Sequence, residues 1–235
     1  MKRSRSTAFV AVLALLVTVA GSAAQAASLQ FNLTAAQTTG TVSYAGGTNP
    51  LVGTAIGIAD IIGLGTSAND GITATCSNCQ LSFMTGNYTG FAGDTWDFDP
   101  DGSVSIVGGV DFPDATPDIT DGTTLLSGSF TTAQLHDHSI FEPGEFHLHL
   151  DAATFTDTKN SAMTDFYGLP GGQYIGGMTI TFQTSTGITP ETAFTSDILN
   201  SGSVVNQPVP IPAAVWLFGS GLLGLIGVTG RRKTA

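Results

Sequence analysis

The stretch Met178-Thr179-Ile180-Thr181-Phe182 alternates apolar and polar residues, and this pattern decides the fold class. Successive side chains of a β-strand point to opposite faces of a sheet, so a period of two predicts a half-buried strand. The same alternation recurs in four other runs, at 80–83, 103–107, 127–130 and 146–150. The body of the chain is therefore predicted to be built from short strands.

Turn signals containing Gly or Pro separate these runs, at 69–71, 101–102, 121–122, 143–144 and 170–172. No stretch of the body shows a long helical period, although 161–168 could hold one short helix. Many strands divided by turns at roughly 8–12-residue intervals favour antiparallel architectures. We therefore predict a mainly β domain over 27–202, folded as an antiparallel β-sandwich or jelly roll.

The charges are distributed unevenly along the chain. Six of the seven Lys and Arg residues lie at the two ends, and Lys159 is the single cation between them. All eighteen Asp and Glu residues lie in this body, so one positive charge against eighteen negative charges gives −17. Binding to a phosphate backbone depends on Lys and Arg, so the composition excludes nucleic acid as a partner.

The N-terminal end has the three parts of a secretory signal peptide. Lys2, Arg3 and Arg5 form a positive start, and a short apolar run follows over 8–20. Ala24-Gln25-Ala26 then supplies the small residues of a cleavage site. Residues 1–26 are therefore predicted to be a signal helix that the secretion translocon and signal peptidase process.

The C-terminal end is predicted to hold a transmembrane helix. The stretch 213–230 carries no charge, and its eighteen residues at about 1.5 Å each would span roughly 27 Å, enough for a hydrocarbon core. Pro210 and Pro212 mark its start, and 203–208 is expected to be a linker from the body. A basic cluster stops the helix on the cytoplasmic side of the inner membrane: Arg231, Arg232 and Lys233.

Together these tail features resemble a known sorting signal. The motif begins at Val209, Pro210, Ile211, Pro212 and Ala213. An apolar stretch and the basic cluster follow it, in the order found in the PEP-CTERM family of Gram-negative bacteria, in its Val-Pro-Leu-Pro-Ala variant. The resemblance covers 209–235 and implies recognition by an exosortase-type membrane protease, transfer to the cell surface and an association with exopolysaccharide or biofilm. The sequence departs from the best-known form because no Glu stands between the prolines.

The only cysteine pair is Cys76-Ser77-Asn78-Cys79. In the oxidising compartment that an exported protein enters, the simplest expectation is a small disulfide closing a turn before the strand at 80–84. A redox centre would need a strand, the Cys pair and a helix in succession, and the Thr-rich flanks do not provide that context.

One acidic run has the spacing of a calcium loop. Asp97, Asp99 and Asp101 alternate before Gly102, and carboxylates two residues apart can converge on one hard cation when the backbone turns. The twelfth position of such a loop is Gly108, where a bidentate Glu would be expected. The alternative is a polar β-turn, since Asp is favoured in turns.

All four histidines fall in one short region. They form two His-x-His pairs, and the members of each pair would share one face of a strand: His136 and His138, then His147 and His149. A hairpin turn at 141–144 would bring the pairs side by side, where Glu142 or Glu145 could add a ligand for zinc, copper or iron. The first pair echoes the metal motif of cupins, without its framing glycines. The alternative is an exposed strand pair with no metal.

These features lead to three readings of function. The first is an exported, non-enzymatic protein of the cell surface or extracellular matrix, which associates with exopolysaccharide. The second is a metal-binding surface protein or enzyme that uses the histidines. The third is a calcium-dependent adhesive or glycan-binding module. The sequence contains no nucleophile elbow, Walker loop or dinucleotide fingerprint.

Overall fold

A computed structural model describes residues 27–35, 39–113, 118–137, 146–184 and 188–209. In this part of the chain it has one short helix and eleven strands, as follows: β1 (Ser28–Leu33), β2 (Thr41–Tyr44), β3 (Pro50–Leu64), β4 (Thr73–Ala92), β5 (Thr95–Phe98), β6 (Ser103–Asp111), β7 (Ile119–Asp137), β8 (Phe146–Lys159), α2 (Ser161–Phe166), β9 (Gln173–Thr184), β10 (Phe194–Thr195) and β11 (Ile198–Pro208). Every strand pair is antiparallel, so the prediction of a mainly β, antiparallel fold is confirmed.

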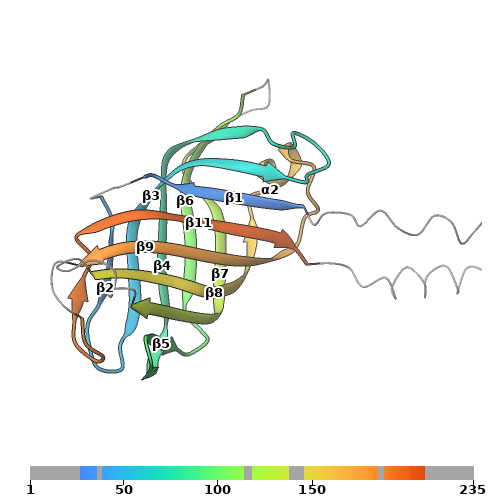
Figure 1. The fold of residues 1–235 in the computed structure, drawn as a ribbon. Coiled ribbons are helices and arrows are strands. Elements are labelled where there is room, and N and C mark those ends of the chain that lie inside the picture. Colours follow the sequence, from blue (N-terminus) through green and yellow to red (C-terminus); the bar gives the residue numbers. More distant parts are fainter. Residues whose placement is uncertain (1–26, 36–38, 114–117, 138–145, 185–187, 210–235) are drawn as a thin grey trace, which may run out of the picture.

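The strands form one continuous sheet that closes on itself, where two separate sheets were expected. The hydrogen bonds run from β3 through β1, β11, β9, β8, β7, β6 and β4, and then back to β3. In Figure 1, β8, β9 and β11 cross in front of β4 and β6 at a steep angle. Bulges in β3 and β4 allow these long strands to bend and change partners along their length, which closes the sheet.

Two local expectations were wrong. The expected linker over 203–208 is the second half of β11, because Val204 and Asn206 are fully buried and β11 pairs with both β9 and β1. The expected turn at 121–122 lies inside β7, where Gly122 has a φ of 79° and the pairing with β6 shifts register. In both places a composition typical of connecting segments concealed a continuous strand.

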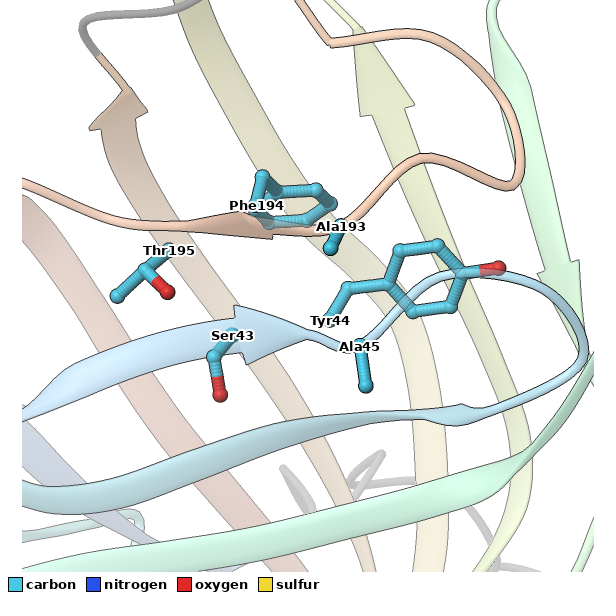
Figure 2. A pocket seen from close by; sticks show the side chains of 6 residues that line it. All are labelled: Ser43, Tyr44, Ala45, Ala193, Phe194 and Thr195. Carbon is cyan, nitrogen blue, oxygen red and sulfur yellow. The ribbon is translucent and has the colours of Figure 1, made fainter.

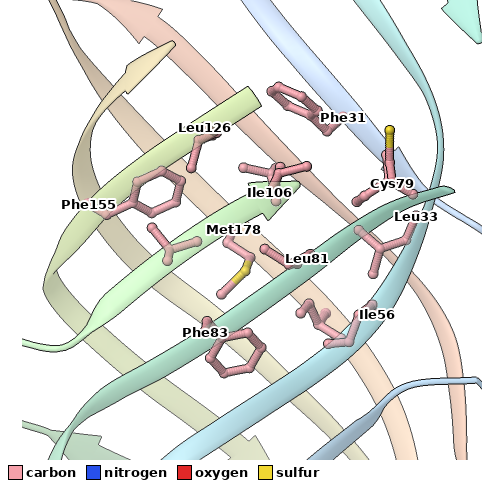
Figure 3. Close-up of a cluster of buried hydrophobic side chains, with 14 of the residues drawn as sticks. Phe31, Leu33, Ile56, Cys79, Leu81, Phe83, Ile106, Leu126, Phe155 and Met178 are labelled. Carbon is pink, nitrogen blue, oxygen red and sulfur yellow. The ribbon is translucent and has the colours of Figure 1, made fainter. Parts of the chain in front are cut away.

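Apolar side chains from strands around the whole ring fill the interior. Figure 3 shows Phe31 of β1, Ile56 of β3, Leu81 of β4, Phe155 of β8 and Met178 of β9 converging on one cluster. All five are buried, with at most 2% of any residue exposed. The described residues therefore supply a complete apolar core of their own, and burial of this kind is the dominant stabilising term in folding.

The short helix expected within 161–168 is confirmed as α2. It starts where the Asn160 side chain accepts a hydrogen bond from the backbone N–H of Ala162, at 3.0 Å, which satisfies one of the free N–H groups at a helix start. Met163 and Phe166 are buried, and the Phe166 ring lies 4.4 Å from that of Phe112, measured between centroids. The helix is therefore held by packing against the sheet rather than by its own length.

Tyr167, which follows α2, predicts a pH dependence of stability. Its hydroxyl lies 3.0 Å from the carbonyl oxygen of Ile61 and 3.2 Å from that of Ile72, and burial raises its pKa to about 12. A raised pKa means that stability is fully present below pH 10, the ordinary tyrosine value, and is lost as the pH rises through 12. We expect Tyr167→Phe to cost about 1–2 kcal/mol at pH 8.

This difference between the wild type and Tyr167→Phe should shrink between pH 10 and pH 12, as measured by urea unfolding across that range. The comparison removes the contributions of other tyrosines, which are the same in both chains. A difference that stays constant up to pH 12 would contradict the assignment.

Candidate functional site

The predicted Cys76–Cys79 disulfide is present, with the two Cα atoms 5.5 Å apart. It forms a bulge inside β4, where the pairing with β6 shifts register, rather than a turn before the strand. Asn78 within the bulge has a φ of 51°, and its side-chain amide donates to Asp121 Oδ2 at 2.6 Å. The hydrogen bonds from Asn78 and Ser77 lower the pKa of Asp121. The Cys pair thus lies within a strand, and no helix directly follows it in the described structure. This is the setting of a structural disulfide and not of a redox centre.

The three aspartates of the expected calcium loop are not gathered into a site. Asp97 lies in β5, where its Oδ1 accepts from Gln134 Nε2 at 2.7 Å, while Asp99 and Asp101 follow in an exposed turn. The turn is positioned by its backbone, since the N–H of Asp101 donates to the Phe130 carbonyl oxygen at 3.2 Å. Among the described side chains, which do not include those of 138–153, no three from His, Cys, Asp or Glu could hold a metal ion.

The calcium prediction is therefore corrected: residues 99–102 form an exposed turn between β5 and β6, and the three carboxylates do not gather into one site. The reason is that β5 is extended through Phe98, and the carboxylate of Asp97 in this strand accepts a hydrogen bond from Gln134 of β7, whereas Asp99 and Asp101 lie in the turn that follows. Asp101 and Gly102 have φ values of 83° and 107°, a conformation that Gly adopts freely and Asp tolerates. The spacing of the three Asp residues before Gly102 is therefore explained by this turn.

The histidines are partly brought together, as the hairpin prediction required. His136 in β7 lies directly opposite His149 in β8, and His147 lies two residues before His149 on the same strand. His138 lies outside the described residues, as do Glu142 and Glu145. Register thus places His136 and His149 as cross-strand neighbours, whose Cβ atoms are typically about 4.5–5.5 Å apart in antiparallel pairs.

The surroundings of His136 restrict the orientation of its ring. Its Nδ1 is 3.0 Å from Oγ1 of Thr95, the first residue of β5, and 3.9 Å from Oδ1 of Asp94, which directly precedes that strand. About 22% of the His136 side chain is exposed, on the strand face opposite buried Leu135. A metal held through Nε2 would leave Nδ1 on Thr95 and near Asp94, the arrangement that commonly orients metal-binding imidazoles.

The predicted sorting and membrane segments meet the described fold at one residue. Val209 is the last described residue, and its N–H donates to the Gln173 carbonyl oxygen at 3.2 Å. The rest of the motif, Pro210, Ile211, Pro212 and Ala213, lies outside the described residues, as does the basic cluster 231–233. Within the described ranges, no helix has the length and apolar character needed to cross a bilayer.

A shallow cavity of about 560 Å³ lies between the end of β2 and β10. Figure 2 shows its lining, which consists of Ser43, Tyr44, Ala45, Ala193, Phe194 and Thr195. Burial raises the pKa of the Tyr44 phenol, and the nearby Tyr88 and Glu191 raise it further, so the phenol stays neutral at physiological pH. Tyr44 is the one residue of these six with an ionisable side chain, and the others offer Ser and Thr hydroxyls and apolar contacts.

The most unusual chemistry in the described structure lies inside the closed sheet, at one end of β8. The lone body cation, Lys159, is enclosed there with Asp157 of the same strand, and both side chains are fully shielded from solvent. Lys159 Nζ donates to Asp157 Oδ1 and, at 3.0 Å, to Oδ1 of Asn206 in β11. The ring centroid of Tyr174 in β9 lies 4.6 Å from Nζ.

This buried cluster is defined by Asp157, Lys159, Tyr174 and Asn206, and sequence reasoning missed it. One clue was visible: Phe155, Asp157 and Lys159 occupy alternate positions, so a strand through them places the two charged residues on the same face as a Phe. The contact with Asn206, 47 residues away, could be seen only in the fold.

Comparison with known proteins does not add a family to these observations. No protein family model matches this chain, and no similar curated protein or solved structure was found.

Proposed function

We propose that this chain is an exported, non-enzymatic protein of the cell surface or extracellular matrix, sorted by an exosortase-type protease and associated with exopolysaccharide. The chain passes through the inner membrane, anchored by the 213–230 segment until it is processed. In this proposal, residues 1–26 are the signal peptide for export and residues 209–235 are the sorting signal.

The observation that carries the proposal is the place where the folded body begins and ends. β1 starts at Ser28, directly after the expected cleavage site, and β11 ends at Pro208, directly before the sorting motif. The core is filled by residues between these points. Removal of both terminal segments would therefore leave the described fold with all its strands and its core.

The pairing of the first and last strands gives further support. Leu29 lies opposite Asn206, so the start of β1 and the end of β11 are neighbours, as Figure 1 also shows. A body built this way can be joined to one membrane surface at both ends at once, as export with a signal peptide and a C-terminal anchor requires. The disulfide in β4 suits the oxidising compartment that lies beyond that membrane.

The outer face offers a surface suited to a polysaccharide. The register aligns Ser82, Ser105, Ser127 and Thr158 in one row across β4, β6, β7 and β8, each at least partly exposed. Uncharged hydroxyls can exchange hydrogen bonds with sugar hydroxyls, without the charge repulsion that the acidic body would exert on an acidic polymer.

Fractionation of the producing cells tests the sorting proposal. The full chain is expected at the cell surface or in the medium, beginning at Ala27 and shortened near Val209, as determined by mass spectrometry. A chain ending at Pro208 should be exported but should not pass through the membrane fraction. A milder variant replaces Arg231, Arg232 and Lys233 by Gln, which removes the basic cluster and keeps the apolar stretch before it. Full-length chain confined to the inner membrane, with no surface form, would contradict the proposal.

The cross-strand pairing of His136 and His149 favours a second candidate, a transition-metal site where β7 pairs with β8. The register places His149 opposite His136, and His147 lies two positions earlier in β8; imidazoles are preferred ligands of Zn²⁺. Calorimetric titration of untagged protein with Zn²⁺ should show binding that weakens at least tenfold in His149→Ala. Gln134→Ala is the control, since Gln134 lies two residues before His136 on the same strand. Equal binding by all three chains would eliminate this site.

A further inference from the structure

The buried cluster lies inside the closed sheet, and its residues come from three neighbouring strands. Asp157 and Lys159 belong to β8, Tyr174 to β9 and Asn206 to β11, and none of the four has an exposed side-chain head group. Gly176 in β9 makes room for it, because a Cβ there would collide with Asn206 Oδ1 and with the Phe155 ring. The amine of Lys159 is thus held against the carboxamide of Asn206 in a space that excludes water.

The hydrogen bonding of this cluster is incomplete. Asp157 Oδ2 and Asn206 Nδ2 are buried, and neither has a hydrogen-bond partner among the described residues. Leaving buried polar atoms unpaired costs free energy, and such atoms are rare in folded proteins. Here both belong to the two groups that flank the Lys159 amine, one an acid and the other an amide.

The protonation state of the amine adds to this picture. Burial lowers the pKa of Lys159 to about 6, so at neutral pH the amine can be present without its proton and with its lone pair free. In such surroundings, transfer of the proton from the amine to the Asp157 carboxylate neutralises two buried charges at once. A neutral amine beside a protonated carboxyl group is a nucleophile beside a general acid.

We propose that Lys159 and Asn206 join in an intramolecular amide bond, formed by the folded protein itself. The lone pair of Lys159 Nζ attacks Asn206 Cγ, and a bond forms between these two atoms. The Cγ–Nδ2 bond then breaks, and the side-chain nitrogen of Asn206 leaves as ammonia. The step exchanges one amide for another, so it needs no oxidant, reductant or cofactor.

Asp157 is the residue that moves the protons in this step. Its carboxyl group contacts Lys159 Nζ directly, so after giving up its own proton it can take the proton that the attacking amine loses. The proton that the carboxyl group gives up ends on the Asn206 nitrogen, so that ammonia is released rather than an amide anion. The carboxyl group ends the step in the state in which it began.

The bond would connect β8 to β11 across β9, which lies between them in the sheet. Asn206 is three residues before Val209, where the proposed sorting segment begins, so a pull on that segment would act first on β11. This benefit rests on the proposed function, whereas the chemistry of the bond does not. A surface protein would gain a covalent link at the strand that carries its anchor.

Trypsin offers a sharp test, because Lys159 is the only Lys or Arg between Arg5 and Arg231. An acylated lysine is not cut. The purified full chain should therefore remain uncut at Lys159 after denaturation and reduction, and its body should be lighter than the sequence mass by one ammonia. Asn206→Leu and Asp157→Asn, which remove the acceptor and the proton carrier, should both be cut after Lys159 and show the full sequence mass.

The wild-type result decides the question even where a variant folds poorly, since digestion is carried out on denatured chains. Cleavage after Lys159 with the full sequence mass would overturn the proposal. Resistance with the full mass would also overturn it, because the amide exchange must release ammonia. A mass lower by one water would place the bond on Asp157 instead and would equally exclude Asn206 as the acceptor.

Discussion

Lys159→Met is expected to lower the free energy of unfolding by about 3–5 kcal/mol at pH 7.5, one of the largest effects of any single substitution in this chain. The substitution leaves the Asp157 carboxyl group fully buried without the Lys159 amine, its hydrogen-bond partner, while Met fills nearly the same space. A buried acid that loses its partner is far more costly than a pair that is absent altogether. Urea unfolding followed by tryptophan fluorescence measures the difference.

The double variant Asp157→Leu/Lys159→Met separates the ion pair from the proposed amide bond. Replacing a buried pair by apolar residues is often nearly neutral, so the double variant should recover most of the loss if no bond had formed. If the bond forms in the wild type, it closes a loop between positions 47 apart, and a chain-entropy estimate made as for a disulfide gives about 4 kcal/mol. The double variant would then stay about that far below the wild type.

A single Lys159→Met variant that unfolds at the wild-type urea concentration would contradict both interpretations. It would mean that water reaches Asp157 and that the cluster is not enclosed as described. Ser127→Ala, a change on the outer face of the neighbouring strand β7, is the matched control and should alter stability by less than about 0.5 kcal/mol.

The alternation of apolar and polar residues was enough to predict the fold class, because one face of each strand contacts the core. Met178, Ile180 and Phe182 are all buried and the residues between them are not, which is the pattern that 178–182 displays. The closure of the sheet could not be predicted this way. It depends on bulges that bend β3 and β4, and a bulge breaks the very period that identifies a strand.

The candidate site was likewise predictable only in part. The Cys76–Cys79 disulfide and the approach of His136 to His149 were predictable because each depends on local spacing or on one hairpin. The calcium prediction was wrong because the same Asp spacing also occurs where a turn follows an extended strand. The buried cluster was missed because inward strand positions are expected to be apolar, and two charged residues there have meaning only once their partner on β11 is known.

Trp96→Ala is expected to cost about 3–5 kcal/mol, the second large effect, because it removes the largest fully buried side chain. The Trp96 ring contacts the aromatic cluster near the shallow cavity, with centroids 5.5 Å from Tyr44 and 5.8 Å from Phe194. Both of these rings line the cavity between β2 and β10. β10 has only two residues and pairs with β2 alone, so its position depends on this packing more than on hydrogen bonds.

Phe91→Ala tests whether the aromatic cluster or the burial of Trp96 accounts for this cost. Phe91 also meets Trp96 edge to face, at 6.2 Å between centroids, but 42% of it is exposed. Its removal opens no enclosed space and should cost less than about 1.5 kcal/mol in the same urea titration. Similar losses in the two variants would mean that Trp96 is not enclosed by Tyr44 and Phe194. A larger loss for Phe91→Ala than for Trp96→Ala would place the stabilising contacts on the outer surface. The packing of β10 against a buried Trp96 ring therefore predicts a loss several times larger for Trp96→Ala than for Phe91→Ala.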